Sequence, residues 1–320
     1  MKKVLVTGGA GFIGSHIVDG YVEEGYQVVV IDDLSRGNRE NLNKEARFHK
    51  MDINDRKIAE VFAEEKFDLV NHHAAQIDLR ISVKKPLLDA KINILGTLNL
   101  LENCLKYKVR NFIFISSGGA IYGEPENMPV DEYYPKNPLS PYAVAKHTIE
   151  HYLYYYRETF ALNYVALRYA NVYGPRQDPF GEAGVIAIFS QRMLKKDRPT
   201  IFGDGEQLRD YIYIDEVVDI NMLVSQKIES LNERRITSPD DLSYNVGIGK
   251  GNSVNFLYRA LAKITDFQEK PIYAPGKKGD IRKIYLDTEK AKKELGWQAK
   301  LQLEDGLEKT VEWFKERKLV

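Results

Sequence analysis

The stretch Val4–Gly14, VLVTGGAGFIG, decides the fold. Its apolar start, Val4–Val6, is typical of a short buried strand of a parallel sheet, and a helix is expected to begin near Phe12. Glycines at intervals of three allow a sharp turn, close approach of the backbone to a pyrophosphate, and tight packing of helix on strand. These glycines are Gly8, Gly11 and Gly14. The stretch predicts a unit that binds dinucleotide phosphates at a helix N-terminus, with an ordinary tight turn as the alternative.

Asp32 indicates which dinucleotide to expect. It ends the next apolar run, Val28–Ile31, and lies 18 residues beyond Gly14. A carboxylate at the end of the second strand accepts hydrogen bonds from a ribose diol and repels a 2′-phosphate. The sequence therefore favours NAD over NADP. Arg36 would suit a 2′-phosphate, but a solvated loop arginine is the favoured interpretation.

The composition excludes several classes of protein. The 320 residues hold 46 Lys and Arg and 46 Asp and Glu, so no net charge draws the chain to nucleic acid or to an anionic membrane. The single cysteine, Cys104, excludes a disulfide scaffold and a cysteine-rich zinc site, and no metal site is expected. Lys2 and Lys3 lead directly into a short strand and no apolar run is long enough to span a membrane. We expect a cytoplasmic protein without a signal peptide.

Strand and helix patterns alternate through the first half of the chain, which is typical of a parallel sheet with helices on both faces. The further expected strands are Gln27–Ile31, Arg47–Met51, Leu69–His72, Asn111–Ile115 and Tyr164–Arg168, and the expected helices are Asp55–Glu65, Lys84–Lys106 and Pro141–Phe160. The predicted fold class is α/β, with a Rossmann-type doubly wound sheet and a smaller C-terminal α/β substrate-binding lobe.

The alternation ends after residue 173. Residues 1–173 are therefore expected to bind the cofactor and residues 174–320 to form the smaller lobe, with helices over Val185–Lys195 and Leu303–Arg317. Two segments of the second half, near 211–220 and 243–248, are expected to cross back to the first sheet. Their strand-like runs are Tyr211–Ile214 and Tyr244–Val246.

Tyr142 and Lys146 form a candidate acid–base pair. Residues four apart share one face of a helix, so the phenol and the ammonium project into one space. The lysine is expected to lower the pKa of the phenol, because a cation favours phenolate, and a cationic nicotinamide would lower it further. A simple surface pair on an amphipathic helix is the alternative.

Ser116 and Ser117 follow the expected strand Asn111–Ile115, at the edge where open α/β sheets bind ligands. Their hydroxyls are candidates for hydrogen bonds to a substrate oxygen, and capping of the local backbone is an alternative of equal weight. His72 and His73 end another strand. Adjacent strand residues point to opposite faces, so this pair is a poor metal chelate. The two histidines are interpreted either as packing residues or as residues that support the site from behind.

Several motifs in order resemble the extended short-chain dehydrogenase/reductase superfamily, and within it most closely the UDP-glucose (UDP-galactose) 4-epimerases. They are TGGAGFIG, the strand-end Asp32, HHAAQ, SSGGAIYG, SPYAVAK, LRYANVYGPRQDP, IFGDG, RDYIYIDEVVD, YNVGIGKG and KKGDIRK. The resemblance covers nearly the whole chain. It implies a UDP-sugar substrate, tightly held NAD that is reduced and reoxidised in each turnover, and a homodimer formed through the helices expected over Lys84–Lys106 and Pro141–Phe160.

The resemblance also implies catalytic roles. Tyr142 would take the proton of the sugar 4′-hydroxyl while hydride leaves C4′, and Lys146 would tune Tyr142 and hold the nicotinamide ribose. A serine or threonine would hydrogen-bond the 4′-oxygen, but its usual position holds Gly118 here. Either Ser117 takes this role through a small backbone shift or a water fills the gap, and Ser117 is our hypothesis.

By the same resemblance, binding residues can be assigned one by one. The cofactor is expected to contact Gly8, Gly11, Phe12, Ile13, Gly14, Asp32, Asp33, Leu34, Ser35, Asn38, Asp52, Ile53, Ala74, Ala75, Gln76, Asn93, Ser116, Tyr142, Lys146 and Tyr169. The nucleotide sugar is expected to contact Ser117, Gly118, Tyr142, Asn171, Val185, Thr200, Phe202, Arg209, Lys277, Asp280 and Arg282. Lys277 stands where the family has an arginine and lacks its bidentate fork, so Arg282 is expected to compensate.

Other functions stay open at this point. The sequence does not separate UDP-hexoses from UDP-N-acetylhexosamines or UDP-uronates. Ile284, the residue expected beside the C2 substituent, is of intermediate size and does not decide between a hydroxyl and an N-acetyl group. Related dehydratases and decarboxylases need acidic residues where this chain has Gly119 and Ala120. A reductase that releases its cofactor is a further alternative. An NAD-binding regulatory protein is the non-enzymatic one, and the intact Tyr142–Lys146 pair argues against it.

Overall fold

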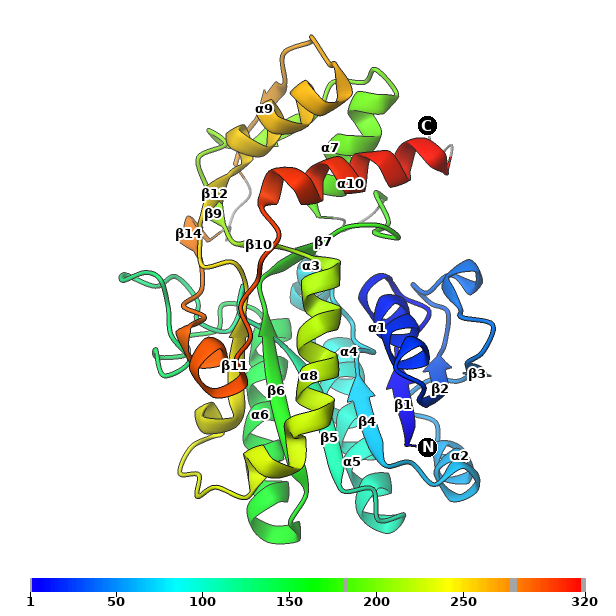
Figure 1. The fold of residues 1–320 in the computed structure, drawn as a ribbon. Helices are drawn as coiled ribbons and strands as arrows, with labels where there is room; N and C mark the ends of the chain where they lie inside the picture. Colours follow the sequence, from blue (N-terminus) through cyan, green and yellow to red (C-terminus); the bar gives the residue numbers. More distant parts are fainter. Residues whose placement is uncertain (1, 181–183, 277–280, 318–320) are drawn as a thin grey trace.

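A parallel sheet of seven strands forms the centre of the protein (Figure 1). The computed structural model describes residues 2–180, 184–276 and 281–317. The strand order is β3–β2–β1–β4–β5–β6–β11, and every neighbouring pair is parallel. The strands are β1 (Lys3–Thr7), β2 (Gln27–Asp32), β3 (Arg47–Lys50), β4 (Leu69–His72), β5 (Asn111–Ser117), β6 (Asn163–Tyr169) and β11 (Ser243–Val246). The predicted Rossmann-type doubly wound fold is confirmed.

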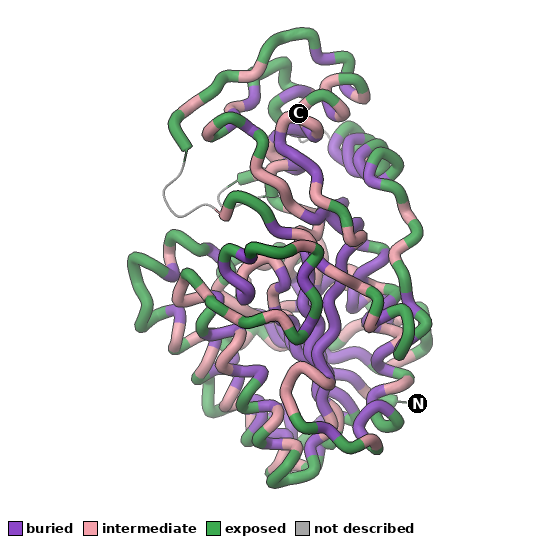
Figure 2. Tube along the Cα trace, turned by 90° about the vertical axis from the view of Figure 1, so that its left-hand side faces the viewer, coloured by how far each residue is buried: buried purple, intermediate pink, exposed green. Residues whose placement is uncertain are grey.

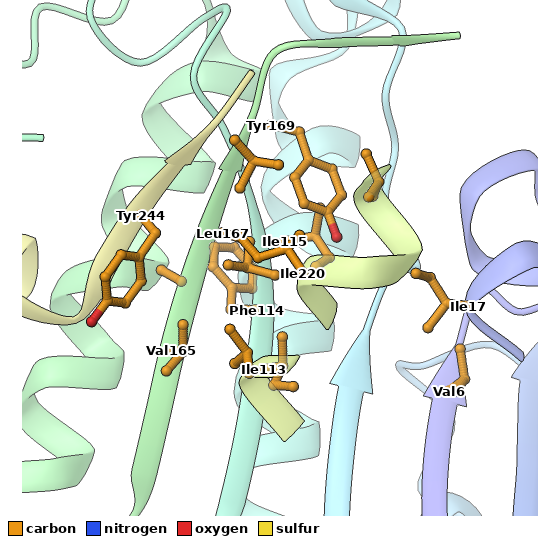
Figure 3. Packing of buried hydrophobic residues seen from close by; sticks show 14 of the residues in the cluster. Val6, Ile17, Ile113, Phe114, Ile115, Val165, Leu167, Tyr169, Ile220 and Tyr244 are labelled. Carbon is orange, nitrogen blue, oxygen red and sulfur yellow. The ribbon is translucent and has the colours of Figure 1, made fainter. Parts of the chain in front are cut away.

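Helices cover both faces of this sheet (Figure 1). α1 (Phe12–Glu23) and α8 (Ile214–Asn232) lie on one face, and α2 (Ile58–Glu65), α5 (Gly96–Lys106) and α6 (Pro141–Phe160) lie on the other. Strands in the middle of such a sheet are mostly apolar because helices cover both of their faces, and Figure 2 shows that the buried residues gather in the centre of the molecule. In Figure 3, side chains of β5 and β6 pack with Ile220 of α8, and Ile17 of α1 lies beside β1.

The strand order reverses between β1 and β4. Open α/β sheets bind ligands at the carboxyl ends of the strands beside such a reversal. The glycine loop follows β1, Asp32 ends β2, the HHAAQ segment begins at the end of β4, and Ser117 ends β5. The fold therefore gathers the residues singled out in the sequence along one edge of the sheet.

The smaller lobe lies beyond the carboxyl ends of the strands (Figure 1). Its short strands pair as β7 (Asn171–Tyr173) with β10 (Tyr211–Tyr213), β8 (Thr200–Phe202) with β13 (Ile272–Ala274), and β9 (Leu208–Arg209) with β12 (Asn252–Ser253) and β14 (Lys283–Ile284). Helices α7 (Val185–Leu194), α9 (Val254–Thr265) and α10 (Leu303–Glu316) pack against one another. The two helices expected in this lobe are thus present as α7 and α10.

Two predicted helices are wrong at their start. α2 begins at Ile58 rather than Asp55. The helix expected over Lys84–Lys106 is interrupted, because α3 (Leu79–Lys84) ends and α4 (Pro86–Ala90) begins after Lys85, which has φ −136° and ψ 63°. The proline ring excludes the preceding residue from the helical region. From Pro86 the helix continues through a π turn, η2 (Lys91–Leu95), into α5.

Short helical turns complete the described part of the chain. They are η1 (Arg39–Asn41), η3 (Pro239–Leu242) and η4 (Ala291–Leu295). Within the described ranges, no helix has the length and apolar character that a membrane crossing would need.

Two segments of the second half return to the large sheet. β11 pairs with β6, which confirms the expectation for Tyr244–Val246. The expectation for Tyr211–Ile214 is wrong, since β10 pairs with β7. The returning element is α8, which packs on α1 and β6 and whose Asn221 donates a 2.6 Å hydrogen bond to the Tyr169 hydroxyl. The division of the chain after residue 173 stays a prediction.

Candidate active site

Glycines bring the loop after β1 close to the loop after β4. Gly8 has φ +70°, and a Cβ there would lie 2.6 Å from the Ala74 nitrogen, so only glycine fits. A Cβ on Gly14 would lie 2.2 Å from the Gly8 carbonyl oxygen. Gly11 is the N-cap of α1, and no side chain of the described residues caps this end, so the first-turn N–H groups at Phe12 and Ile13 are available to an anion. The loop fits the pyrophosphate of a dinucleotide.

Asp32 connects the loops on either side of it. Its Oδ2 accepts a hydrogen bond from the Ala10 N–H at 3.0 Å, and its Oδ1 accepts one from Leu34 at 2.8 Å. Burial raises the pKa of Asp32, and the two N–H donors oppose that shift. Each carboxylate oxygen can accept more than one hydrogen bond, so a ribose diol fits as a further donor.

The other residues expected at the adenosine end follow β2 and β3. Asp33 accepts hydrogen bonds from the Ser35 N–H and hydroxyl at 2.8 and 2.6 Å. The Asn38 side chain caps η1, and Asp52 accepts from the Asn54 N–H at 2.8 Å. Ile53 is buried. The structure brings these residues to one edge of the sheet, and their contacts with adenosine stay predictions.

A chain of uncharged hydrogen bonds lies beneath the loop after β4. His72 Nδ1 lies 2.6 Å from the Thr7 hydroxyl, and Nε2 lies 2.9 Å from the Thr97 hydroxyl. Thr97 donates its own proton to the Asn93 carbonyl at 2.8 Å, so it accepts from His72 Nε2–H and Thr7 donates to Nδ1. Burial holds the pKa of His72 well below its ordinary value. We call Thr7, His72, Thr97 and Asn93 the neutral network.

Asp89 is a buried carboxylate that connects this network to the loop. It accepts hydrogen bonds from Gln76 Nε2 at 2.9 Å and from Asn93 Nδ2 at 3.0 Å. The Gln76 N–H donates to Asn93 Oδ1, and Asn93 Nδ2 donates to the Gln76 carbonyl, both at 2.9 Å. Burial raises the pKa of Asp89, while these amide donors and the Lys146 charge lower it. Asp89 therefore fixes the loop Ala74–Gln76 and presents a carboxylate toward Lys146.

Tyr142, Ser117 and Lys146 meet at the carboxyl end of β5. Ser140 caps α6 by accepting from the Ala143 N–H at 3.2 Å, which places Tyr142 in the first turn of the helix. The Ser117 hydroxyl lies near enough to the Tyr142 phenol to act on its pKa, which it lowers. Lys146 Nζ donates to the Ile115 carbonyl at 2.7 Å and lies 5.8 Å from the centre of the Tyr142 ring. A phenol, a hydroxyl and a cation thus share one site.

The expected effect of Lys146 on Tyr142 is not found. Burial raises the pKa of Tyr142 to about 12, Ser117 opposes the shift and Asp89 adds to it. Burial likewise lowers the pKa of Lys146 to about 8. The Lys146 ammonium is directed to the Ile115 carbonyl, so the phenol gains little from its charge. A phenolate at neutral pH needs a further positive charge in the site.

Gly118 cannot carry a side chain without rearrangement. A Cβ there would lie 2.6 Å from Leu286 Cδ1 and 2.9 Å from the Arg168 carbonyl oxygen. The Gly118 N–H also donates to the Tyr169 carbonyl at 2.9 Å, which ties this backbone to β6. Because Ser117 already reaches Tyr142, the geometry favours Ser117 over a water as the source of the missing hydroxyl.

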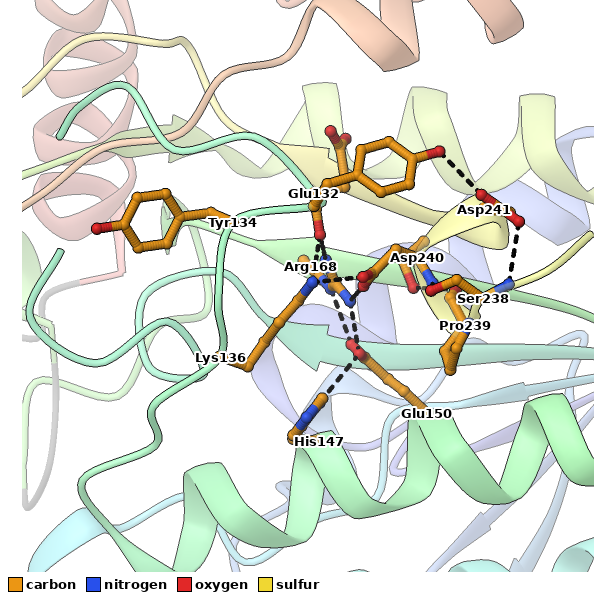
Figure 4. Close-up of polar contacts among 12 residues, drawn as sticks. Glu132, Tyr134, Lys136, His147, Glu150, Arg168, Ser238, Pro239, Asp240 and Asp241 are labelled. Atoms are coloured by element: carbon orange, nitrogen blue, oxygen red, sulfur yellow. Dashed lines mark hydrogen bonds and ion pairs between the residues drawn. The ribbon is translucent and has the colours of Figure 1, made fainter.

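A cluster of buried charges lies behind α6, with Arg168 of β6 at its centre (Figure 4). Arg168 Nε and Nη2 donate to the two oxygens of Glu150 at 3.0 and 2.7 Å, and Nη2 also donates to Asp240 at 2.6 Å. Nη1 donates to the Tyr122 hydroxyl and the Glu132 carbonyl at 3.0 and 2.8 Å. All five N–H donors of the guanidinium are therefore used. We call Arg168, Glu150 and Asp240 the charged cluster.

The charged cluster joins the helix that carries Tyr142 and Lys146 to the sheet. Glu150 lies one helical turn beyond Lys146 on α6, and neither Glu150 nor Arg168 is exposed to solvent. Burial acts against both charges, but the Arg168 guanidinium holds the pKa of Glu150 well below its usual range. The buried Ser116 hydroxyl contributes to that lowering. The ion pair thus fixes α6 against β6.

Comparison with known proteins agrees with this geometry. The model of the NAD dependent epimerase/dehydratase family matches residues 4–247, a span that includes the glycine loop, Ser117, Tyr142 and Lys146. The chain belongs to this family. Its members use NAD, which fits the glycine loop and Asp32.

Individual members of the family match the chain over nearly its whole length. A UDP-glucose 4-epimerase of Mycolicibacterium smegmatis is 41% identical in an alignment 322 positions long, which covers 98% of this chain and 99% of the relative. The structure of a Thermotoga maritima UDP-glucose 4-epimerase with UDP-glucose has a TM-score of 0.93 at 48% identity and covers 98% of this chain and 99% of that one. A Thermus thermophilus UDP-glucose 4-epimerase in complex with NAD has a TM-score of 0.88 at 40% identity, with the same coverage.

Tyr169, which the family resemblance places beside the nicotinamide, is almost fully buried at the end of β6. Its hydroxyl accepts from Asn221, and the centre of its ring lies 6.5 Å from that of His73. Burial raises the pKa of Tyr169 and lowers that of His73 to about 3, so both side chains are uncharged near neutral pH. Their contact with a nicotinamide stays a prediction.

The residues expected at the nucleotide sugar come from the smaller lobe and from its junction with the sheet. Asn171 begins β7, and a Cβ on Gly119 would lie 3.9 Å from its Oδ1, so its amide faces the turn after Ser117. Val185 is the first residue of α7, and no described side chain caps that helix. Thr200 and Phe202 belong to β8, and Arg209 ends β9.

Two expected substrate residues, Lys277 and Asp280, lie outside the described residues. Arg282, which is expected to compensate for Lys277, donates from both ends of its guanidinium to Asp204 at 2.7 and 2.8 Å. Both side chains of this pair are about half exposed. A role for Arg282 toward a diphosphate stays a prediction.

Three buried residues of the site were missed in the sequence. The role of Arg168 could have been predicted, because an arginine inside an apolar strand needs a buried partner of opposite charge. Glu150 carries a weaker signal, because it lies one turn beyond Lys146 on the same helix. Asp89 carries none, because the loop that it holds is specified only by the fold.

Proposed function

We propose that the protein is a UDP-glucose 4-epimerase, which interconverts UDP-glucose and UDP-galactose by inverting C4 of the hexose. The observation that carries this proposal is the meeting of Tyr142, Ser117 and Lys146 at the switch point of the sheet. The likeness to UDP-glucose 4-epimerases along nearly the whole chain supports the choice of reaction.

Tyr142 is the proposed acid–base group. Its phenolate takes the proton of the sugar 4-hydroxyl, and the Ser117 hydroxyl holds the phenol and the same sugar oxygen in place. The glycine loop and Asp32 would hold NAD, which would supply first the acceptor and then the donor of the C4 hydride, on opposite faces of that carbon. Tyr142 then gives its proton back to the 4-oxygen, so a turnover consumes neither proton nor hydride.

Lys146 supports this chemistry in two ways. Its ammonium is proposed to hold the nicotinamide ribose, and its charge adds to that of the oxidised cofactor in favouring the phenolate. Asp89 faces Lys146 and stabilises its protonated form against burial. Because the pKa of Lys146 is about 8, turnover is expected to decline above that pH.

The smaller lobe is proposed to bind the UDP group. The N-terminus of α7, at Val185, offers N–H groups and a positive dipole end to the diphosphate, and Arg209 offers a cation. Phe202 is 39% exposed on β8, where an aromatic ring can stack on uracil beside Thr200. Asn171, whose amide faces the turn after Ser117, is proposed to contact the diphosphate as well.

An epimerase for UDP-N-acetylhexosamines or UDP-uronates is the second candidate. Ile284, the residue expected beside the C2 substituent, is almost fully buried in β14. Its side chain therefore does not by itself exclude a substrate with a larger C2 substituent. A dehydratase is disfavoured because Gly119 and Ala120 provide no acid for an elimination. A panel of UDP-galactose, UDP-N-acetylgalactosamine and UDP-glucuronate distinguishes these substrates.

The test of the proposal is incubation of the purified protein with UDP-galactose and no added NAD. We expect UDP-glucose to form, and Tyr142→Phe to retain NAD while losing about 10²–10⁴-fold in turnover. Tyr133→Phe is the matched control, since Tyr133 is 57% exposed and its loss should leave turnover unchanged. Absence of interconversion with every UDP-hexose, despite bound NAD, would contradict the proposal.

A homodimer formed through α4, η2 and α6 is also proposed. Apolar side chains on these elements are exposed in the single chain: Leu87 is 86%, Leu95 57%, Tyr155 49% and Val144 46% exposed. Burying such a surface against its own copy removes it from water. Light scattering should give the mass of two chains, and Leu87→Asp should shift it toward one. A monomeric wild type would contradict the proposal, and a cytoplasmic location stays a prediction.

A further inference from the structure

His147 and His151 lie one turn apart on α6, outside the catalytic site. Their Nε2 atoms are 3.4 Å apart, whereas the centres of the two rings are 4.7 Å apart. Because the nitrogens are closer than the ring centres, the rings approach each other at their Nε2 corners. In the single chain both side chains reach the surface, since His151 is exposed and the His147 side chain is 25% exposed. His151 lies on the same face of α6 as Val144 and Tyr155, so in the proposed homodimer it lies beside the interface.

This separation matches that of two ligands on one metal ion. Nitrogens each about 2.0–2.1 Å from a tetrahedral zinc ion lie about 3.3–3.4 Å apart. Without a metal ion the same contact is a hydrogen bond between the two rings, longer than the usual range of about 2.7–3.2 Å for an N–H donor. Histidines four residues apart also share one face of a helix, as in the helical H-x-x-x-H zinc motifs. We propose that His147 and His151 form a binding site for a divalent transition metal ion.

The surroundings orient His147 for this role. Its Nδ1 faces Glu150 Oε2 at 3.6 Å, as Figure 4 shows, and leaves Nε2 directed away from the cluster. Metal-binding histidines commonly present their second nitrogen to a carboxylate, which fixes the tautomer and the direction of the ring. Glu150 is itself held by the two hydrogen bonds from Arg168, so its carboxylate serves as the rigid outer partner.

The donor set defines the class of ion. Two imidazole nitrogens suit Zn²⁺, Ni²⁺ or Cu²⁺, whereas Mg²⁺ and Ca²⁺ require oxygen ligands. No group of three or more His, Cys, Asp or Glu ligands is found in the described part of the chain, so water completes the coordination. The proposed site departs from the expectation that the chain binds no metal, which rests on Cys104 and on the pair His72 and His73 and stays a prediction.

Metal binding at this site should stabilise the folded form of α6. An ion held by both rings joins residues 147 and 151 across the turn that follows Lys146. Binding only to the folded helix raises the stability of the folded state, and the unfolding temperature should rise with metal concentration. Because neither histidine contacts Tyr142 or Ser117, we expect epimerase turnover to continue in the absence of the ion.

The experiment is a calorimetric titration of the NAD-containing protein with Ni²⁺. We expect one ion per chain, affinity at least about tenfold weaker in His151→Gln and in His147→Gln, and no binding of Mg²⁺ at this site. His49→Gln is the matched control, since His49 lies on β3 far along the sheet order from β6, and it should bind Ni²⁺ like the wild type.

Unfolding scans without metal show that the variants are folded before they are titrated. Equal Ni²⁺ affinity in the wild type and in both α6 variants would overturn the proposal, as would a wild type that binds no Ni²⁺. Neither result bears on the epimerase reaction, which is measured separately in the same samples.

Discussion

Two buried polar groups hold the proposed catalytic residues in place, one through uncharged hydrogen bonds and the other through an ion pair. The neutral network joins β1, β4 and α5 through His72, with every proton matched to one acceptor and no charge. The charged cluster joins β6 and α6 through Arg168, whose five donors are matched to two carboxylates, a hydroxyl and a carbonyl. The first supports the loop Ala74–Gln76, which is proposed to line the cofactor site, and the second supports the helix that carries Tyr142 and Lys146.

The difference shows how the site controls its charges. Lys146 is buried and its pKa is already lowered to about 8, so a second cation beside it would lower that pKa further. A neutral His72 supports the loop without adding that charge. Arg168 keeps its charge buried behind α6, compensated by Glu150 and Asp240. Substitutions of Arg168, His72 and Asp204 and a change of pH distinguish support by a buried ion pair from support by uncharged hydrogen bonds.

Loss of Arg168 should have the largest effect. Arg168→Met leaves the Glu150 carboxylate buried without its partner, which costs about 3–5 kcal/mol of unfolding free energy. Urea denaturation measures this change. The double variant Arg168→Met/Glu150→Gln removes both charges and should regain part of the loss. If the single variant is as stable as the wild type, the cluster does not support α6.

Substitution of His72 should lower the free energy of unfolding by less than substitution of Arg168, because no buried charge loses its partner. His72→Leu removes the partners of the Thr7 and Thr97 hydroxyls and should cost about 1–3 kcal/mol. Thr97→Val breaks one link of the same network and is the matched smaller change. If His72→Leu lowers the free energy of unfolding by more than Arg168→Met does, the charged cluster is not the stronger of the two supports.

The pH dependence of stability should carry the signature of the neutral network. The pKa of His72 is held well below its ordinary value in the folded protein, whereas the unfolded chain takes up this proton near pH 6.5. Stability contributed by the neutral imidazole is therefore complete above about pH 6.5 and is lost as the pH falls, by up to about 1.4 kcal/mol per unit. Denaturation between pH 7 and pH 5 measures this slope. In His72→Leu the slope should be shallower, and an unchanged slope would contradict the assignment.

The smallest effect is expected at an exposed arginine pair. Arg282 and Asp204 also form a bidentate pair, through Nη1 and Nη2 rather than through Nε and Nη2 as in Arg168, but both side chains are about half exposed. Solvent screens such pairs, so Asp204→Ala should leave the unfolding midpoint within error of the wild type. A loss comparable to that of Arg168→Met would mean that burial is not what separates the two pairs.

The sequence could predict those features of the structure that depend on residues close together in the chain. Glycine spacing, Asp32 and the alternating patterns specify the large sheet, because each depends on residues close together in the chain. The serine turn and the Tyr142–Lys146 spacing likewise predict that these groups meet. The break before Pro86 was also readable from local chemistry, and was overlooked.

What the sequence could not predict depends on packing between distant segments. The effect of burial on Tyr142, which outweighs that of Lys146, depends on what covers the ring. Asp89 gains its role only because the fold places the loop after β4 over α4 and η2. The residue patterns also predicted the wrong segment, Tyr211–Ile214, as the one that returns to the large sheet. The helix that returns is α8, along which apolar residues recur every three or four positions, at Val217, Ile220, Val224, Ile228 and Leu231.

The central claim is that one site removes a hydride from C4 and returns it without exchange with water. UDP-galactose carrying deuterium at C4 tests this claim directly, with the protein as purified and no added NAD. The account predicts UDP-glucose that retains the deuterium at C4, with none in the solvent. Product that has lost the deuterium to water would contradict it, because the hydrogen would then have left as a proton.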